Sequence, residues 1–143
     1  MRLTLKQANE IISGALAAAA ASGIPPLTVV VVDDAGHVVA AQRQDGASMF
    51  RFDVALGKAW AAVAMGASSR ALARRASGNP NFFVALASTA GGRFLPQPGA
   101  ALIRDVDGNI LGAAGASGGT GDQDEACCVD GIQTAGLVAD ASE

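Results

Sequence analysis

Glycine dominates residues 115–121, which follow an apolar segment and lead into the acidic residues 122–125. Glycine lets backbone N–H groups approach a ligand closely, and a helix beginning there would offer unpaired N–H groups and a partial positive charge to an anion. We therefore expect a pocket for a small anion, with Ser117, Gly118 and Gly119 contacting the ligand. The spacing indicates neither GxxxxGK[ST] nor GxGxxG, so no nucleotide site is expected. A strand-to-helix turn without a ligand would explain the same glycines.

Three charged side chains, Arg43, Asp45 and Lys58, form a second candidate group. Arg43 and Asp45 follow an apolar segment, and Lys58 lies in an almost uncharged helical stretch. Burying a lone lysine is costly without a partner, so we expect Lys58 to extend to solvent or to pair with Asp45, Asp124 or a ligand. Such a cation would neutralise a bound carboxylate, and an aspartate beside it would orient it.

Other site chemistries find little support. One histidine and two adjacent cysteines do not supply the spaced ligands that zinc prefers, so we expect no metal site. Cys127 and Cys128 are neighbours and poorly placed to bridge each other, which predicts small buried side chains and no disulfide framework. Serine hydrolysis would depend on His37 as its base.

An internal similarity bears on the role of His37. Residues 33–39 and 105–111 align without a gap, and each segment places an acidic residue and a glycine between apolar stretches. His37 occupies the position of Asn109, and both residue types tolerate the backbone angles of turns. A structural role at the exit of a turn explains His37, with ligation or proton transfer as the alternative.

Composition limits the class of protein. A chain of 143 residues has the length of one domain, so we expect residues 1–143 to form a single domain. The net charge of −3 argues against a nucleic-acid partner. Glycine and proline interrupt the uncharged stretch before Asp33, so we expect no membrane span and a cytoplasmic location, with a cleaved secretory signal as the alternative. Long alanine stretches predict tight subunit contacts in a homo-oligomer.

Hydrophobic periodicity predicts an α/β (α+β) fold in the order α-β-β-α-(α)-(α)-β-β-α, with two hairpins in an antiparallel sheet flanked by helices. The first strand is too apolar for an edge, so we expect it in the middle of the sheet. The expected elements are helix 4–22, strands 27–32 and 37–42, helices 48–67 and 69–76, a helix opened by Asn79 and Pro80, a hairpin over 101–116 and a final helix 122–139.

In order, and over nearly the whole chain, these residues resemble the GlcG/HbpS family, which is also similar to the C-terminal domain of PduO-type proteins. The resemblance implies a compact α/β fold and assembly into oligomers, octamers included. The segments that carry it are Val31–His37, Arg43–Ala47, Lys58-Ala59, Gly115–Thr120 and Gln123–Glu125.

Some members of that family bind haem, so the resemblance implies haem as one candidate cofactor and His37 as a candidate residue for it. The chain departs from that pattern because it has no tyrosine and no histidine in its first helix. Our leading hypothesis is an oligomeric domain that binds a small anionic organic ligand, with haem, through its propionates, as one candidate. The alternative is a cofactor-independent isomerase, tautomerase or lyase for a small oxo acid, in which Lys58 or Asp124 moves a proton.

Overall fold

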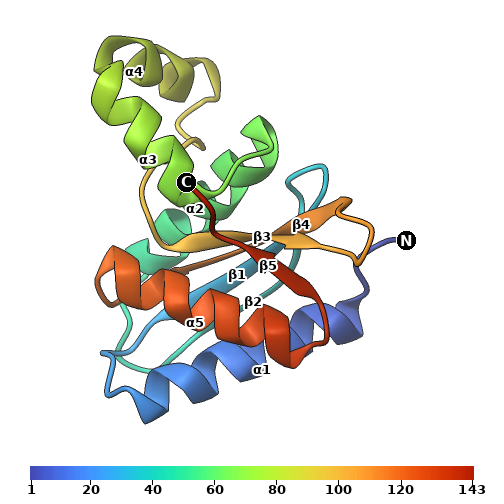
Figure 1. The fold of residues 1–143 in the computed structure, drawn as a ribbon. Coiled ribbons are helices and arrows are strands. Elements are labelled where there is room, and N and C mark those ends of the chain that lie inside the picture. The colour runs from blue at the N-terminus through green and yellow to red at the C-terminus, as the bar shows by residue number, and fades with distance from the viewer.

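A five-stranded antiparallel sheet in the order β2-β1-β4-β3-β5 organises the chain (Figure 1). The computed structural model describes residues 1–143. In chain order the elements are α1 (Leu5–Ala21), β1 (Thr28–Asp33), β2 (Val38–Arg43), α2 (Phe50–Met65), α3 (Ser69–Gly78), α4 (Pro80–Thr89), β3 (Ala100–Arg104), β4 (Ile110–Ser117), α5 (Gly121–Thr134) and β5 (Val138–Asp140). The expected α/β fold, the order of its first nine elements and its two hairpins are confirmed.

Strand β1 lies inside the sheet, between β2 and β4. Its residues Val29–Val32 have no exposed surface, which confirms the interior position expected from its run of β-branched side chains. The register pairs Thr28 with Ser117 on β4 and with Arg43 on β2. The sheet therefore brings two of the predicted site residues, Arg43 and Ser117, to the same end of the two strands that flank β1.

Helices cover both faces of the sheet. Helices α1 and α5 pack on one face, α2 packs on the other, and α3 and α4 extend away from the sheet on the α2 side (Figure 1). Alternation along β1 follows this division, because Val29 and Val31 belong to the core with α1 and α5, whereas Val30 and Val32 belong to the core with α2. None of the helices combines the length and the apolar character needed to cross a membrane.

The final helix is shorter than predicted. Helix α5 ends at Thr134, so the expectation that it continues to residue 139 is wrong. Gly136 follows with a φ of 76°, a conformation that favours glycine, and the chain then forms the short edge strand β5 beside β3. An ion pair of 2.8 Å between Arg104 and Asp140 joins the two strands. Three residues are too few to show the period of a strand, which is why the sequence pattern missed β5.

The two hairpin turns are built alike, as the internal similarity suggested. In the first, Oδ1 of Asp33 accepts hydrogen bonds from the N–H groups of Ala35 and His37. In the second, Oδ1 of Asp105 accepts from the N–H groups of Asp107 and Asn109. His37 therefore lies at the exit of an Asx-type turn, with its side chain 81 % exposed.

Candidate functional site

Lys58 and Asp124 form a buried ion pair between α2 and α5. Nζ of Lys58 lies 3.3 Å from Oδ2 of Asp124, and the two side chains are 7 % and 1 % exposed. The same Nζ donates a hydrogen bond of 3.0 Å to the carbonyl oxygen of Ala116 on β4. The sequence analysis expected Lys58 to reach solvent or to pair with Asp45, Asp124 or a ligand, and in the structure it pairs with Asp124.

Most of the glycine loop is bonded to its own chain. The N–H of Gly119 donates to Oδ1 of Asp124 over 2.9 Å, and the N–H of Thr120 donates to Oε1 of Gln123 over 2.9 Å. Gly118 packs so closely on the chain before β1 that a methyl group there would come within 2.6 Å of the Leu27 side chain. The loop therefore serves first to place Asp124, which bridges the Gly119 amide and the Lys58 ammonium.

A capping box begins α5 immediately after this loop. Oγ1 of Thr120 accepts a hydrogen bond from the N–H of Gln123, and Oε1 of Gln123 accepts one from the N–H of Thr120. This arrangement leaves the N–H groups of Gly121 and Asp122 without a partner in the chain. The start of α5 therefore presents two free donors at the positive end of the helix.

A cavity of about 420 Å³ lies between α2, the start of α5 and the loop that precedes β3. Its volume is that of a small-molecule site. Lys58 reaches it with one N–H still free, because an ammonium has three donors and two are used within the chain. The residues that line it are Val54, Lys58, Leu95, Gln97, Pro98, Thr120, Gly121 and Asp122.

Gly99, at the end of that loop, makes room for the lysine. A methyl group at this position would lie 2.5 Å from Nζ of Lys58, and the φ of Gly99 is 132°, which L side chains rarely adopt. Only glycine at position 99 therefore allows Lys58 its path to Ala116 and Asp124.

Arg70 on α3 balances the acidic residues at the start of α5. Its guanidinium pairs with Asp122 and, at 2.9 Å, with Glu125. The hydrogen bond to Asp122 contributes most to raising the pKa of Arg70, and burial raises the pKa of Glu125 against the opposing effect of Arg70. The carboxylate of Asp122 is thus partly neutralised where it borders the cavity.

Ser117 has a partner that the sequence analysis did not single out. Oγ of Ser117, which is 1 % exposed, accepts a hydrogen bond of 3.3 Å from Nη1 of Arg51 on α2. Arg51 precedes Lys58 by two helical turns on the same side of α2, and that spacing could have indicated it.

Arg43 and Asp45 lie apart from Lys58. They line a separate depression of about 530 Å³ with Ile24, Pro26 and Gln44, where β2 ends. Both residues are exposed. The structure therefore groups Lys58, Asp124 and Gly119 in one hydrogen-bonded cluster, and it places Arg43 and Asp45 at a separate depression.

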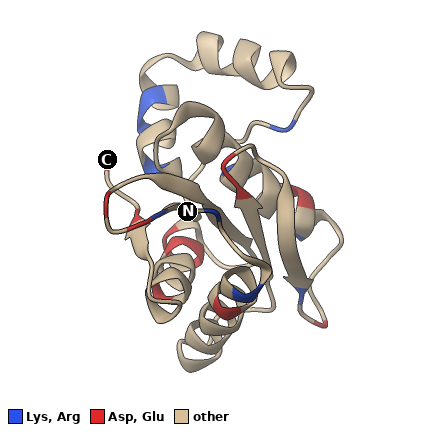
Figure 2. Cartoon of the chain, turned by 90° about the vertical axis from the view of Figure 1, so that its right-hand side faces the viewer, with Lys and Arg blue, Asp and Glu red and all other residues tan.

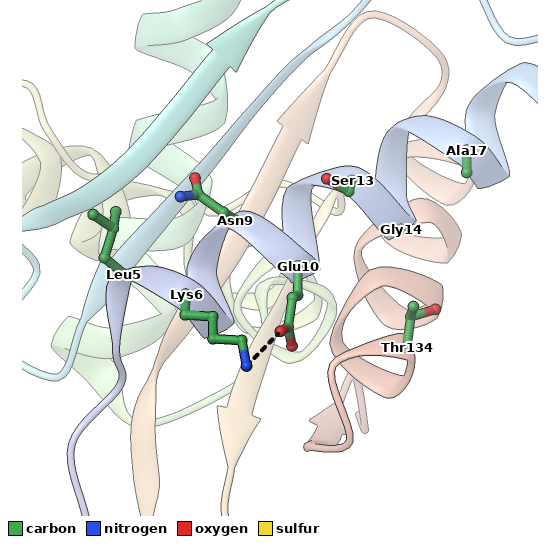
Figure 3. Close-up of a pocket in the computed structure, with 8 residues that line it drawn as sticks. All are labelled: Leu5, Lys6, Asn9, Glu10, Ser13, Gly14, Ala17 and Thr134. Atoms are coloured by element: carbon green, nitrogen blue, oxygen red, sulfur yellow. Dashed lines mark ion pairs between the residues drawn. The ribbon is translucent and has the colours of Figure 1, made fainter.

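A larger depression is a shallow groove between α1 and α5, with a volume of about 750 Å³ (Figure 3). Small side chains such as Ser13, Gly14 and Ala17 line it, and its one ion pair is the solvent-exposed Lys6–Glu10 pair at 3.9 Å. No predicted site residue lies in this groove. A solvent-exposed ion pair such as Lys6–Glu10 contributes little to the stability of the fold. We therefore place the candidate site at the smaller cavity beside Lys58.

Comparison with known proteins agrees with this architecture. The family model described as haem degrading protein HbpS-like matches residues 3–133. The chain belongs to the HbpS-like family. No curated protein matches the sequence.

Solved structures of similar fold cover almost the whole chain. A crystal structure of a PduOC–haem complex is 24 % identical with a TM-score of 0.86 and covers 98 % of this chain and 99 % of its own. A double mutant of Streptomyces reticuli HbpS is 28 % identical with a TM-score of 0.79, covering 93 % and 86 %. The Klebsiella pneumoniae protein ORFY is 23 % identical with a TM-score of 0.84, covering 95 % and 92 %.

Proposed function

We propose that this HbpS-like chain binds a small organic anion in the cavity beside Lys58. The free N–H of Lys58 and the two unpaired amides that begin α5 supply donors for one carboxylate group. Asp124 orients the ammonium, and it is itself held by the Gly119 amide. The observation that carries the proposal is a buried cation with one unused donor at the wall of a cavity of ligand size.

Haem enters this proposal through its relatives, because the matching family is described as haem degrading and one similar structure is a haem complex. The residues that line the cavity include no histidine, cysteine, methionine or tyrosine, the side chains that hold haem iron, so the iron does not fit them. His37 points into solvent on a hairpin turn, and burial raises the pKa of both Cys127 and Cys128, which keeps these thiols protonated. We therefore assign the carboxylate groups of a ligand, and no metal, to Lys58 and α5.

Two measurements test the proposed function. Mass spectrometry of the natively purified protein should detect a retained organic acid, and acetate or butyrate should raise the thermal unfolding midpoint of ligand-free protein. A parallel haem titration that follows the Soret band decides whether haem belongs to the ligand class, since no shift at micromolar protein removes it. Failure of every carboxylate to bind would overturn the proposal.

A second candidate function is proton transfer on a small oxo acid, and the burial of Lys58 with Asp124 beside a cavity favours it. The ammonium and the helix start would stabilise an enolate, as in cofactor-independent isomerases, tautomerases and lyases. Exchange of the pyruvate methyl protons in D₂O, followed by NMR, is the measurement. Catalysed exchange that disappears in the double variant Lys58→Met/Asp124→Asn would favour the enzyme over a binding protein.

The proposed form of the protein is a homo-oligomer. Helix α4 carries no charged residue (Figure 2), and its Phe82 and Val84 are 51 % and 71 % exposed. Met49 and Phe50 at the start of α2 are also exposed, at 80 % and 63 %. Exposed apolar side chains of this size are typical of protein contacts. Light scattering after size-exclusion chromatography gives the subunit number, and a monomer at micromolar concentration would contradict this assignment.

A further inference from the structure

A second cation lies on the same side of α2 as Lys58. Arg51 precedes Val54 by three residues and Lys58 by seven, and these spacings place the three side chains on one face of the helix. Val54 and Lys58 line the cavity. Arg51 takes part in none of the chain's ion pairs, whereas the charge of Lys58 is shared with Asp124. The uncompensated positive charge on this side of α2 is therefore that of Arg51.

One buried hydroxyl group, that of Ser117, contacts Arg51, and a second, that of Thr28, lies next to Ser117 in the sheet. Ser117 accepts the hydrogen bond from Arg51, and Thr28 is the Cα partner of Ser117 across the β1–β4 ladder. Partners in an antiparallel ladder point to the same face, with Cβ atoms about 5 Å apart. Thr28 has no exposed surface, and its Oγ1 has no hydrogen-bond partner. An unpaired buried hydroxyl costs stability, so it calls for a reason beyond packing.

We infer that the ligand is a dicarboxylate, an inference that rests on the proposed function. One carboxylate binds at Lys58 and the start of α5, and the other binds the guanidinium of Arg51 with the hydroxyls of Ser117 and Thr28 as further donors. The Cα atoms of Arg51 and Lys58 are about 10 Å apart along the helix. Nζ of Lys58 is held by Asp124 and Ala116, whereas Arg51 has an exposed side chain and lies outside the residues that line the cavity. The ligands that this arrangement predicts are short aliphatic diacids such as succinate and glutarate.

The test compares acids of equal chain length by isothermal titration calorimetry. Succinate is compared with butyrate and glutarate with valerate, on the wild-type protein and on the variant Arg51→Met. We expect each diacid to bind about tenfold or more tightly than its partner, as a charge-assisted hydrogen bond predicts. Arg51→Met should abolish that advantage and leave the affinity for butyrate and valerate unchanged. Arg75→Met, an exposed arginine on α3 without an ion pair, serves as the matched control.

A second variant tests the hydroxyl directly. Thr28→Val removes the unpaired group, so it should raise the free energy of unfolding and weaken the binding of succinate but not of butyrate. If butyrate binds and succinate binds no more tightly, or if the higher affinity for succinate persists in Arg51→Met, this inference is overturned and the proposed function stays intact. Absence of binding by all four acids would overturn both.

Discussion

Nζ of Lys58 lies 3.3 Å from Oδ2 of Asp124, with both side chains almost fully removed from solvent. A buried ion pair is weak evidence of stabilisation, because desolvation of the two charges offsets most of their attraction. Here each charge has further partners, since Lys58 donates to Ala116 and Asp124 accepts from Gly119. The pair therefore fixes the cavity wall by joining α2, the end of β4 and the glycine loop.

Removing one member of this pair should destabilise the protein strongly. Lys58→Met leaves the Asp124 carboxylate buried without its cation, at an expected cost of about 3–5 kcal/mol in the free energy of unfolding. The double variant Lys58→Met/Asp124→Asn carries no buried charge and keeps an acceptor for the Gly119 amide, so it should recover most of that loss. Urea unfolding measures both variants. Equal losses in the single and double variants would show that the two charges are not coupled.

The close approach of Gly99 to Lys58 gives a prediction for the loop before β3. Gly99→Ala forces a side chain into a strained φ of 132° and to within 2.5 Å of Nζ, so we expect a loss of about 1–3 kcal/mol together with weaker binding of butyrate. Gly78→Ala is the control, because nothing lies within 4 Å of a methyl group at that position on α3. Thermal unfolding and calorimetry of the two variants provide the comparison, and an unperturbed Gly99→Ala variant would contradict this account of the loop.

The sequence patterns could predict the helices, both hairpins and the interior position of β1 because these depend on local periodicity. They also indicated Lys58, since a lone lysine among alanines needs a partner wherever it is buried. The choice of Asp124 over Asp45 could not be read from the chain, because it depends on how α5 folds back under β4.

Other parts of the site depend on tertiary pairing for the same reason. Arg51 contacts Ser117 across 66 residues, and although its spacing from Lys58 places both on one side of α2, that spacing does not reveal the contact with Ser117. The glycine loop was predicted to present its amides to a ligand, yet the Gly119 and Thr120 amides bond to side chains on the first turn of α5. A capping pattern and a ligand loop use the same residue types, so composition alone does not separate them.

The two capping boxes provide a matched pair of variants. Thr120→Ala and Thr4→Ala each remove the hydroxyl that caps a helix, and each should cost about 1 kcal/mol in the free energy of unfolding. Only Thr120 borders the cavity, so only Thr120→Ala should also weaken the binding of butyrate. Equal butyrate affinity in the two variants would show that the start of α5 does not take part in ligand binding.

The hairpin turns predict a difference in acid stability. The side chain and the N–H of Asn109 donate to Asp105 and lower the pKa of its carboxyl. A carboxyl with a lowered pKa stabilises the fold above its ordinary pKa of about 3.9, and this stabilisation is lost as the pH falls through the lowered value. Asn109→Ala removes the side-chain bond and returns the pKa of Asp105 toward the ordinary value.

Acid unfolding of Asn109→Ala, followed by circular dichroism, should therefore begin at a higher pH than that of the wild type. His37→Ala at the corresponding position of the first turn is the control, because Nδ1 of His37 lies 3.9 Å from Asp33 and its side chain is mostly exposed. Below the pKa of Asp105 in the wild-type fold, the contribution of this carboxyl is absent from both proteins, so their difference in stability should shrink there. A difference that stays constant from neutral pH to that range would mean that Asn109 acts through packing and not through the charge of Asp105.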